Sequence, residues 1–217
     1  MIPDGDLESL KQGRFAILII DVHAGHIGGD ATIPVPGGES IIRPLDDLLK
    51  EARKSKVPII QVLHKPRQNG VEVRSNPFWN SVSFARVYPH IREHNIGLAS
   101  PLLEIDSTDY TVDTKKRYSA FYGTDLEILL RSLCVDTVVL AGLTTDCCVL
   151  NTAFDAFNRD FKVVLVENCT ETDFPQDKSA VLSIVSRLLG WVMDSKEVTN
   201  LIRSAATIWS SQNQSSN

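Results

Sequence analysis

Three reactive side chains of the sequence each stand at the end of a short apolar run or just beyond it. They are the carboxylate of Asp21, the ammonium of Lys115 and the thiol of Cys148. Thiolate is the nucleophilic form of cysteine, and the first turn of a helix stabilises it through free N–H groups and the helix dipole. A carboxylate can accept the thiol proton, and a nearby ammonium favours the charged form. Together, these residue types are typical of covalent catalysis by cysteine.

Each of these residues also has an ordinary structural interpretation. A carboxylate at a strand end is often a turn or helix-capping residue, and a cysteine early in a helix is often structural. Lys115 belongs to a charged run with Lys116 and Arg117, and such runs are usually solvated. The residue types do not separate Cys148 from its neighbour Cys147. The catalytic interpretation therefore requires all three groups to meet at one place.

The apolar runs predict a fold that would bring these groups together. They are continuously apolar rather than alternating, as in strands of a parallel sheet covered on both faces. Segments with apolar residues at helical spacing separate them, which predicts right-handed crossovers. Ligands bind such sheets beyond the carboxyl ends of the strands. The strands are expected at Phe15–Asp21, Val57–Leu63, Tyr110–Thr114, Asp136–Gly142, Lys162–Glu167 and Trp191–Met193.

We therefore expect an α/β fold: a three-layer, doubly wound, mostly parallel sheet of about six strands with helices on both faces. No linker or repeat divides the chain, so residues 1–217 are expected to form a single domain. Its core would span residues 15–201, and residues 205–217 would be a frayed polar tail. Helices are expected at Ile41–Lys54, around Leu126–Leu130, at Val149–Phe157, at Val181–Leu188 and around Glu197–Ser204.

Composition and charge argue against several classes of protein. The net charge is −5 and no basic run contains interleaved aromatic residues, so no nucleic-acid partner is expected. The longest apolar runs are too short to cross a bilayer, and the acidic N-terminus lacks the apolar region of a secretory signal. We therefore expect a cytoplasmic protein with no membrane contact. Cys134 and Cys169 are expected to be small buried hydrophobic residues.

The stretch Lys65–Pro101 differs from the rest of the chain because it is long and irregular. Such segments often cover or line a binding site, although an excursion packed on its own domain or on a partner subunit fits equally well. Phe78 and Trp79 of this stretch, together with Tyr118, are candidates for the wall of a substrate pocket. The stretch also carries Asn80, Phe84, Tyr88, His90 and His94.

Two long motifs carry a resemblance to a known family. Lys115–Phe121 reads K-K-R-Y-S-A-F and is followed by G-T-D-L, similar to K-x-R-Y-S-A-F…G-T-x-L. Ala141–Ala156 resembles G-x-x-T-D-x-C-V-x-x-T-A-x-D-A. With the strand ending in Asp21, these motifs make the chain from about Phe15 to Leu201 resemble the isochorismatase-like cysteine hydrolase superfamily. That group includes nicotinamidases, N-carbamoylsarcosine and ureidoacrylate amidohydrolases, biuret hydrolases and isochorismatases.

The register of the motifs implies which residues would be catalytic. It selects Lys115 over Lys116 and Cys148 over Cys147, and adds Asp21 as the third member of the triad. The family fold is a doubly wound α/β sheet, which agrees with the strands expected above. Family members are commonly dimers or tetramers, so the resemblance implies a homo-oligomer that acts on a small-molecule substrate.

The resemblance also implies an unusual turn before the nucleophile. In the family a cis peptide bond lies at the position of Leu143–Thr144, and non-proline cis bonds tend to mark functional sites. The backbone N–H groups matching Thr144 and Cys148 would form the oxyanion hole.

The chain departs from the family pattern at its histidines. The family usually has Gln two residues after the aspartate, where this chain has His23. His23 either takes over the polar, pocket-facing role of that Gln or, like His26, hydrogen-bonds within a loop, and the sequence leaves both interpretations open. Nicotinamidases carry Asp-x-His and a further His as a metal motif. Here His64 lacks those partners, so we expect neither a metal nor another cofactor.

Retention of the thiol favours hydrolysis of a C–N bond, in an amide or ureide, through a covalent acyl-enzyme on Cys148. The main alternative is hydrolysis of the vinyl ether of isochorismate to pyruvate and a dihydrodiol, which needs an acid but no thiol. Isochorismatases of this family typically carry Gly at the cysteine position. A third interpretation is a non-catalytic member that binds a metabolite, although a pure binder has no need of this triad. The sequence does not determine the substrate.

Overall fold

The computed structural model describes residues 4–31, 33–65, 67, 71, 75–88 and 101–214. Turns of 3₁₀ type lie at Gly38–Ile41 and Pro175–Asp177, and a π-helical turn lies at Thr145–Val149. The strands are β1 (Phe15–Ile20), β2 (Ile59–His64), β3 (Tyr110–Lys115), β4 (Thr137–Leu143), β5 (Lys162–Glu171) and β6 (Gly190–Met193). The helices are α1 (Asp4–Lys11), α2 (Ile42–Lys54), α4 (Val82–Val87), α5 (Leu126–Ser132), α6 (Leu150–Phe157), α7 (Lys178–Leu188) and α8 (Ser195–Gln214).

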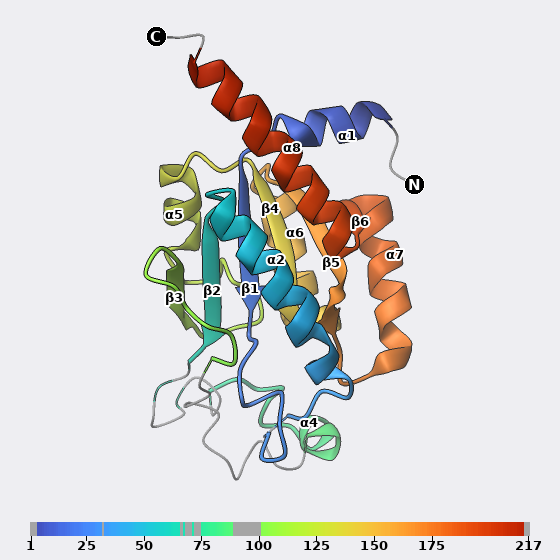
Figure 1. Cartoon of the computed structure of the whole chain (residues 1–217). Coiled ribbons are helices and arrows are strands. Elements are labelled where there is room, and N and C mark those ends of the chain that lie inside the picture. Colours follow the sequence, from blue (N-terminus) through green and yellow to red (C-terminus); the bar gives the residue numbers. More distant parts are fainter. Residues whose placement is uncertain are drawn as a thin grey trace.

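The strands form one six-stranded sheet in the order β3-β2-β1-β4-β5-β6, and each neighbouring pair is parallel (Figure 1). Every residue of β1 and β4 is buried. A strand covered on both faces has no solvent side, so its sequence is apolar throughout rather than alternating. The expected α/β fold with a parallel sheet is confirmed.

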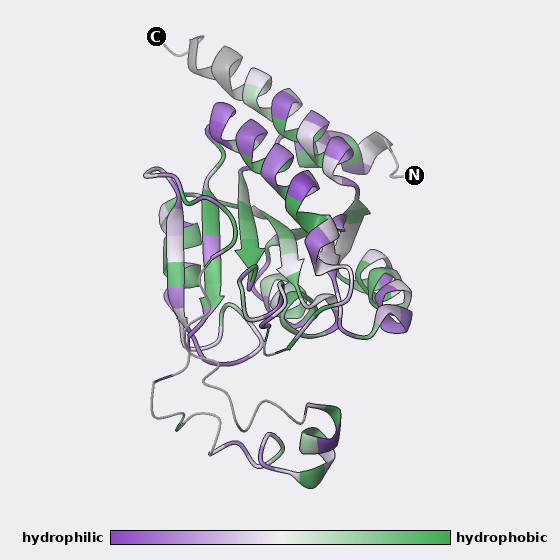
Figure 2. Ribbon diagram, turned by 60° about the horizontal axis from the view of Figure 1, so that its bottom comes forward, coloured by the Kyte–Doolittle hydropathy of each residue, from purple (hydrophilic) through white to green (hydrophobic). Residues whose placement is uncertain are grey.

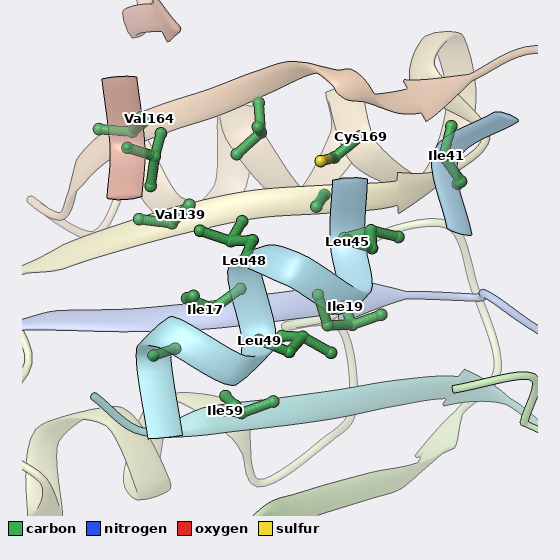
Figure 3. Close-up of a cluster of buried hydrophobic side chains, with 14 of the residues drawn as sticks. Ile17, Ile19, Ile41, Leu45, Leu48, Leu49, Ile59, Val139, Val164 and Cys169 are labelled. Atoms are coloured by element: carbon green, nitrogen blue, oxygen red, sulfur yellow. The ribbon is translucent and has the colours of Figure 1, made fainter. Parts of the chain in front are cut away.

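Helices cover both faces of this sheet. On one face lie α1, α2 and α8, where Leu45 and Leu48 of α2 pack on Ile17 and Ile19 of β1 (Figure 3). On the other face lie α5, α6 and α7, whose buried residues share a second cluster with Leu18. Figure 2 shows the strands as a hydrophobic layer between helices that carry hydrophilic residues as well. The three expected layers are therefore present.

Helix α8 extends further than the sequence suggested. It continues to Gln214, so the expectation of a frayed tail is corrected for residues 205–214, while residues 215–217 lie outside the described part of the chain. Val198, Leu201, Ile202 and Ala205 are all buried at helical spacing. This apolar stripe packs α8 against the sheet and against α1 and α2, which holds the helix past residue 204.

The two cysteines that were expected to be buried differ in their exposure to solvent. Cys134 is exposed, not buried as expected, because it occupies a left-handed turn (φ 55) between α5 and β4. Cys169 is buried, as expected.

The irregular stretch contains the short helix α4, which lies beyond the carboxyl ends of the strands (Figure 1). Within the described residues, no helix is both long and apolar enough to cross a membrane.

Candidate active site

Strands β1 and β4 lie side by side at the centre of the sheet, and the chain leaves them in opposite directions. From β1 it crosses through α2 to β2, and from β4 it crosses through α6 to β5. Right-handed crossovers in opposite directions put their helices on opposite faces, and open α/β sheets bind ligands at such a switch point. Asp21 directly follows β1, and Cys148 lies in the turn after β4.

Gly142 lets the two strand ends approach each other. It pairs with Ile20 and has a φ of +112°. A Cβ at this position would stand 2.0 Å from the Ile20 carbonyl oxygen, a backbone atom that cannot move aside. Glycine is therefore required here. Asp21 directly follows Ile20, the last residue of β1, and its backbone lies in the left-handed region with φ 51. Its N–H donates to the Val62 carbonyl at 2.9 Å.

Lys115 makes the central contacts of the site. Its Nζ lies 2.5 Å from Asp21 Oδ2 and 3.3 Å from Cys148 Sγ. The Lys115 and Asp21 side chains are each only 1% exposed. The other carboxylate oxygen, Asp21 Oδ1, accepts the backbone N–H of His64 at 2.6 Å. The fold thus brings together the three residues singled out in the sequence, and it is Lys115, not Lys116, that meets the other two.

Burial and charge act in opposite directions on this ion pair. Burial alone would raise the pKa of Asp21, but the Lys115 ammonium, with smaller contributions from His64 and His23, holds that pKa below its ordinary value. Burial alone would lower the pKa of Lys115, but the Asp21 carboxylate and the Cys148 sulfur raise it. Both residues are therefore charged at neutral pH.

The turn between β4 and α6 positions the thiol. The Leu143–Thr144 peptide bond is cis, as the family resemblance implies. The π-helical turn follows at once, and the Val149 N–H donates to the Thr144 carbonyl at 3.1 Å. Single π-helical turns are rare in proteins, and those that occur often lie at functional sites. Thr170 fixes the strand end, because its Oγ1 donates to the Gly142 carbonyl at 2.8 Å.

The two adjacent thiols of this turn have different surroundings. Lys115 contacts the sulfur of Cys148. A hydrogen bond with Cys148, together with burial, raises the pKa of Cys147. Cys147 is therefore held as a neutral thiol, while Cys148 has the ammonium beside it.

Thr152 of α6 joins the two segments that carry the lysine and the cysteine. Its Oγ1 donates to the Cys148 carbonyl at 2.7 Å and accepts the Ala120 N–H at 3.0 Å. Ala120 lies five residues after Lys115 in the same motif. Sequence reasoning missed this role, although Thr152 stands within the cysteine motif and the motif position was its only signal.

The aromatic candidates for the pocket divide into two groups. The Trp79 indole N–H donates to the Tyr118 hydroxyl at 2.8 Å, and the Arg117 guanidinium lies 5.1 Å from the Trp79 ring centre. Burial is the largest cause that raises the pKa of Tyr118. Phe78 is different: its side chain is 60% exposed and its ring packs on Phe84, 5.7 Å between centres.

Both histidines make hydrogen bonds within the loop after β1, which is one of the two interpretations that the sequence left open. His26 is a loop residue, with its Nδ1 3.1 Å from the Ile33 carbonyl oxygen. His23 is buried and stacks on His26, with ring centres 4.7 Å apart. One of its nitrogens, Nδ1, accepts the Gly25 N–H at 3.1 Å, while Nε2 has no partner among the described residues. The two remaining histidines of the irregular stretch, His90 and His94, lie outside the described residues.

The helix α4 segment is tied to the cysteine side of the site. The Tyr88 hydroxyl donates to Asp173 Oδ2 at 2.7 Å, and its ring packs against Phe174. Thr172 next to them donates to Asp146 Oδ1 at 2.6 Å, two residues before the thiol. This link joins residues far apart in the chain, so no local sequence pattern indicated it.

No group of three or more His, Cys, Asp or Glu side chains comes together as a metal site in the ranges that the structure describes. The Asp21 carboxylate lies close to His64, but its two oxygens already accept hydrogen bonds from Lys115 Nζ and from the His64 backbone N–H.

Comparisons with known proteins identify the family. The model of the isochorismatase domain matches residues 15–197. A relative from Arabidopsis thaliana, named a probable inactive nicotinamidase, is 30% identical over 168 residues, which cover 76% of this chain and 84% of that protein.

Solved structures agree with this result. A cysteine hydrolase from Pseudomonas syringae pv. phaseolicola is 25% identical with a TM-score of 0.75, covering 88% of this chain and 93% of that one. An N-carbamoylsarcosine amidase from Thermoplasma acidophilum is 26% identical with a TM-score of 0.67. The match covers 84% of this chain and 96% of that one. The domain match and the shared fold show that the chain belongs to the isochorismatase family and is a hydrolase of that family.

Proposed function

We propose that the protein hydrolyses a C–N bond of a small amide or ureide through a covalent intermediate on Cys148. The observation that carries the proposal is the position of Lys115 Nζ, in contact with both Asp21 Oδ2 and Cys148 Sγ. A buried carboxylate and a half-buried thiol that share one buried ammonium supply a proton acceptor, a nucleophile and their counter-ion. Hydrolysis of a vinyl ether has no use for the thiol.

The first half of the reaction forms the acyl-enzyme. Asp21 accepts the thiol proton, and the Cys148 sulfur attacks the substrate carbonyl carbon. The Thr144 and Cys148 N–H groups stabilise the oxyanion, a contribution worth roughly 10²–10³ in rate for a single donor. The C–N bond then breaks, and protonated Asp21 gives its proton to the leaving nitrogen.

The second half releases the acid. Asp21, again a carboxylate, removes a proton from water as the water oxygen attacks the thioester carbonyl. The tetrahedral intermediate expels sulfur, and Asp21 returns the proton to it. Lys115 stays protonated throughout, because its interactions with Asp21 and with the Cys148 sulfur keep its pKa raised. Its role is to hold the carboxylate and the sulfur at fixed positions.

Trp79 and Tyr118 are proposed as the wall of the substrate pocket. The Trp79 indole donates to the Tyr118 hydroxyl, and the Trp79 ring lies edge-on to the ring of His64, whose backbone N–H donates to Asp21. Assembly into a homo-oligomer and a cytoplasmic location remain predictions from the sequence. Light scattering on the purified protein tests the first, because a dimer doubles the mass of the 24.0 kDa chain.

The decisive experiment measures two products in parallel. Ammonia or amine release is followed with a panel of small amides and ureides, and pyruvate release is followed with isochorismate. Cys148→Ala should abolish C–N hydrolysis, whereas the matched variant Cys147→Ala should retain most of it. Pyruvate release that survives in Cys148→Ala but not in Asp21→Ala would identify a vinyl-ether hydrolase instead.

A non-catalytic protein is the other outcome to be tested, and the Arabidopsis thaliana relative is itself named as probable inactive. Iodoacetamide labelling at neutral pH addresses it without a substrate. Cys148 should be alkylated faster than exposed Cys134, and Lys115→Met should remove that difference. Equal labelling of the cysteines, together with no turnover of either substrate class, would overturn the proposal.

A further inference from the structure

Two threonine hydroxyls connect the residues on either side of the Leu143–Thr144 peptide. Thr170 Oγ1, near the end of β5, donates to the Gly142 carbonyl at 2.8 Å. Thr145 Oγ1 lies 2.8 Å from the same Thr170 oxygen. A hydroxyl has one proton to donate, and that of Thr170 goes to Gly142, so Thr145 is the donor to Thr170. Both threonines are fully buried, so this hydroxyl chain is closed off from solvent.

Strand β5 reaches the turn through an irregularity in its pairing with β4. From Leu140 to Gly142, β4 advances two residues while β5 advances five, from Leu165 to Thr170. In an unshifted register Gly142 would pair with Glu167, and Thr170 would lie beyond the turn. Extra residues of this kind bend a strand and redirect its side chains, and they are common next to active sites. The irregularity is therefore what brings the Thr170 hydroxyl to the turn.

The peptide enclosed by the hydroxyl chain carries the N–H of Thr144, one of the two proposed oxyanion donors. Thr144 is buried, and its N–H has no hydrogen-bond partner among the described residues. Buried backbone N–H groups without a partner are rare, and a developing oxyanion would supply the acceptor. The Thr144 carbonyl is fixed separately, because it accepts the N–H groups of Cys147 and Val149 at 3.2 and 3.1 Å.

We propose that Thr145 and Thr170 are positioning residues that hold the Thr144 N–H in the direction of the oxyanion. This inference rests on the proposed function, in which that N–H stabilises the tetrahedral intermediate. The chain fixes the Gly142 carbonyl on one side of the peptide and the Thr145 side chain on the other, which restricts rotation of the peptide between them. A donor oriented in advance lowers the barrier rather than improving substrate binding. The hydroxyl chain therefore acts on kcat and not on KM.

Two reagents that both react with Cys148 separate the oxyanion donor from the thiol. The ester p-nitrophenyl acetate acylates sulfur through a tetrahedral oxyanion and releases p-nitrophenolate. Iodoacetamide alkylates sulfur by displacement at a saturated carbon, which needs no oxyanion donor. Thr145→Val, which removes the hydroxyl but keeps the side-chain shape, should slow acylation by at least about tenfold, within the roughly 10²–10³ lost with a whole donor. Its alkylation rate should equal that of the wild type.

Three further variants test whether the effect belongs to the hydroxyl chain. Thr145→Ser keeps the hydroxyl and should restore most of the acylation rate. Thr170→Val breaks both hydrogen bonds of the chain and should slow acylation at least as much as Thr145→Val. The matched control is Thr137→Val at the start of β4, where an equally buried hydroxyl donates to Asp136, away from the site. This control should lower Tm and leave acylation unchanged.

Steady-state kinetics with the best substrate of the amide and ureide panel complete the test. Thr145→Val should lower kcat and leave KM unchanged. A rise in KM alone, unchanged acylation, or equal slowing of acylation and alkylation would each overturn the positioning role. Slowing of acylation by Thr137→Val as well would overturn it too, because loss of stability would then suffice. The proposed function fails separately, if Cys148→Ala is acylated and hydrolyses the panel as fast as the wild type.

Discussion

Lys115 and Asp21 form a buried ion pair, 2.5 Å between Nζ and Oδ2, although 94 residues separate them in the chain. Lys115 ends β3, two strands away from β1 in the sheet, and its long side chain reaches past the end of β2. Strand β2 contributes the His64 N–H to the other oxygen of the same carboxylate. The pair therefore joins the ends of three neighbouring strands.

Removing one partner of this pair should cost stability as well as activity. Lys115→Ala leaves a buried carboxylate without its counter-ion, which typically costs about 3–5 kcal/mol. Urea unfolding measures the loss. The matched control is Lys65→Ala, which breaks the exposed Lys65–Asp113 pair and should cost less than about 1 kcal/mol. Equal effects of the two variants would contradict the buried charged state of the site.

Thr152→Val should impair catalysis without touching the reacting groups. The variant removes the hydroxyl that joins the Cys148 carbonyl to the Ala120 N–H and leaves that N–H buried without a partner. We expect a loss of about 1–3 kcal/mol in stability and a clear fall in kcat. Thr152→Ser keeps the hydroxyl and should restore most of both. A fall in stability with unchanged kcat would show that the bridge does not position the thiol.

The buried histidines predict that stability depends on pH. Burial is the largest cause that lowers the pKa of His23 and of His64 to about 4. Below about pH 6.5 the unfolded chain binds protons that the folded protein does not, so the free energy of unfolding falls by at most about 1.4 kcal/mol per pH unit for each histidine.

Urea midpoints at pH 7, 6 and 5 measure this fall, and His23→Gln should make it shallower. Asp21 acts in a lower range. Its folded pKa is below the ordinary value, so its stabilising effect persists above about pH 4 and is lost only as pH falls further. A flat stability profile between pH 7 and 5 would mean that the histidine rings are not buried as neutral groups.

Tyr88→Phe should weaken substrate binding if the α4 segment covers the site. The change removes the hydrogen bond from Tyr88 to Asp173 but keeps the ring contacts with Phe84 and Phe174. We expect KM to rise several-fold with little change in kcat. The control Tyr122→Phe alters a phenol that is 64% exposed and should have no effect. Identical kinetics in the two variants would exclude a role for this link.

Gly142→Ala should prevent the sheet from forming correctly, because the new Cβ would overlap the Ile20 carbonyl at 2.0 Å and φ is +112°. We expect insoluble or strongly destabilised protein, measured by the yield of folded protein and by Tm. Gly29→Ala is the matched control, since nothing lies within 4 Å of its added Cβ. A normally folded Gly142→Ala protein would mean that β1 and β4 can separate at their ends.

The sequence by itself predicted the six strands and the helices between them, although not α1 or α4, and it singled out the residues that we propose as reactive. Continuous apolar runs located strands such as β1 and β4, because strands buried on both faces need no polar positions. Motif register singled out Lys115 and Cys148 from equally reactive neighbours. These are local properties of the chain. The helix end expected near residue 204 was wrong, because α8 continues to Gln214 and buries residues as far as Ala205 against the core.

Only the tertiary structure decided how those residues meet. The ion pair of Lys115, the Thr152 bridge and the tie between Tyr88 and Asp173 each join segments brought together by strand order and crossover direction. The same holds for His23, whose two possible roles looked equal in the sequence. Burial and the Gly25 N–H fix its tautomer, because the contacts of one ring nitrogen determine the chemistry of the other.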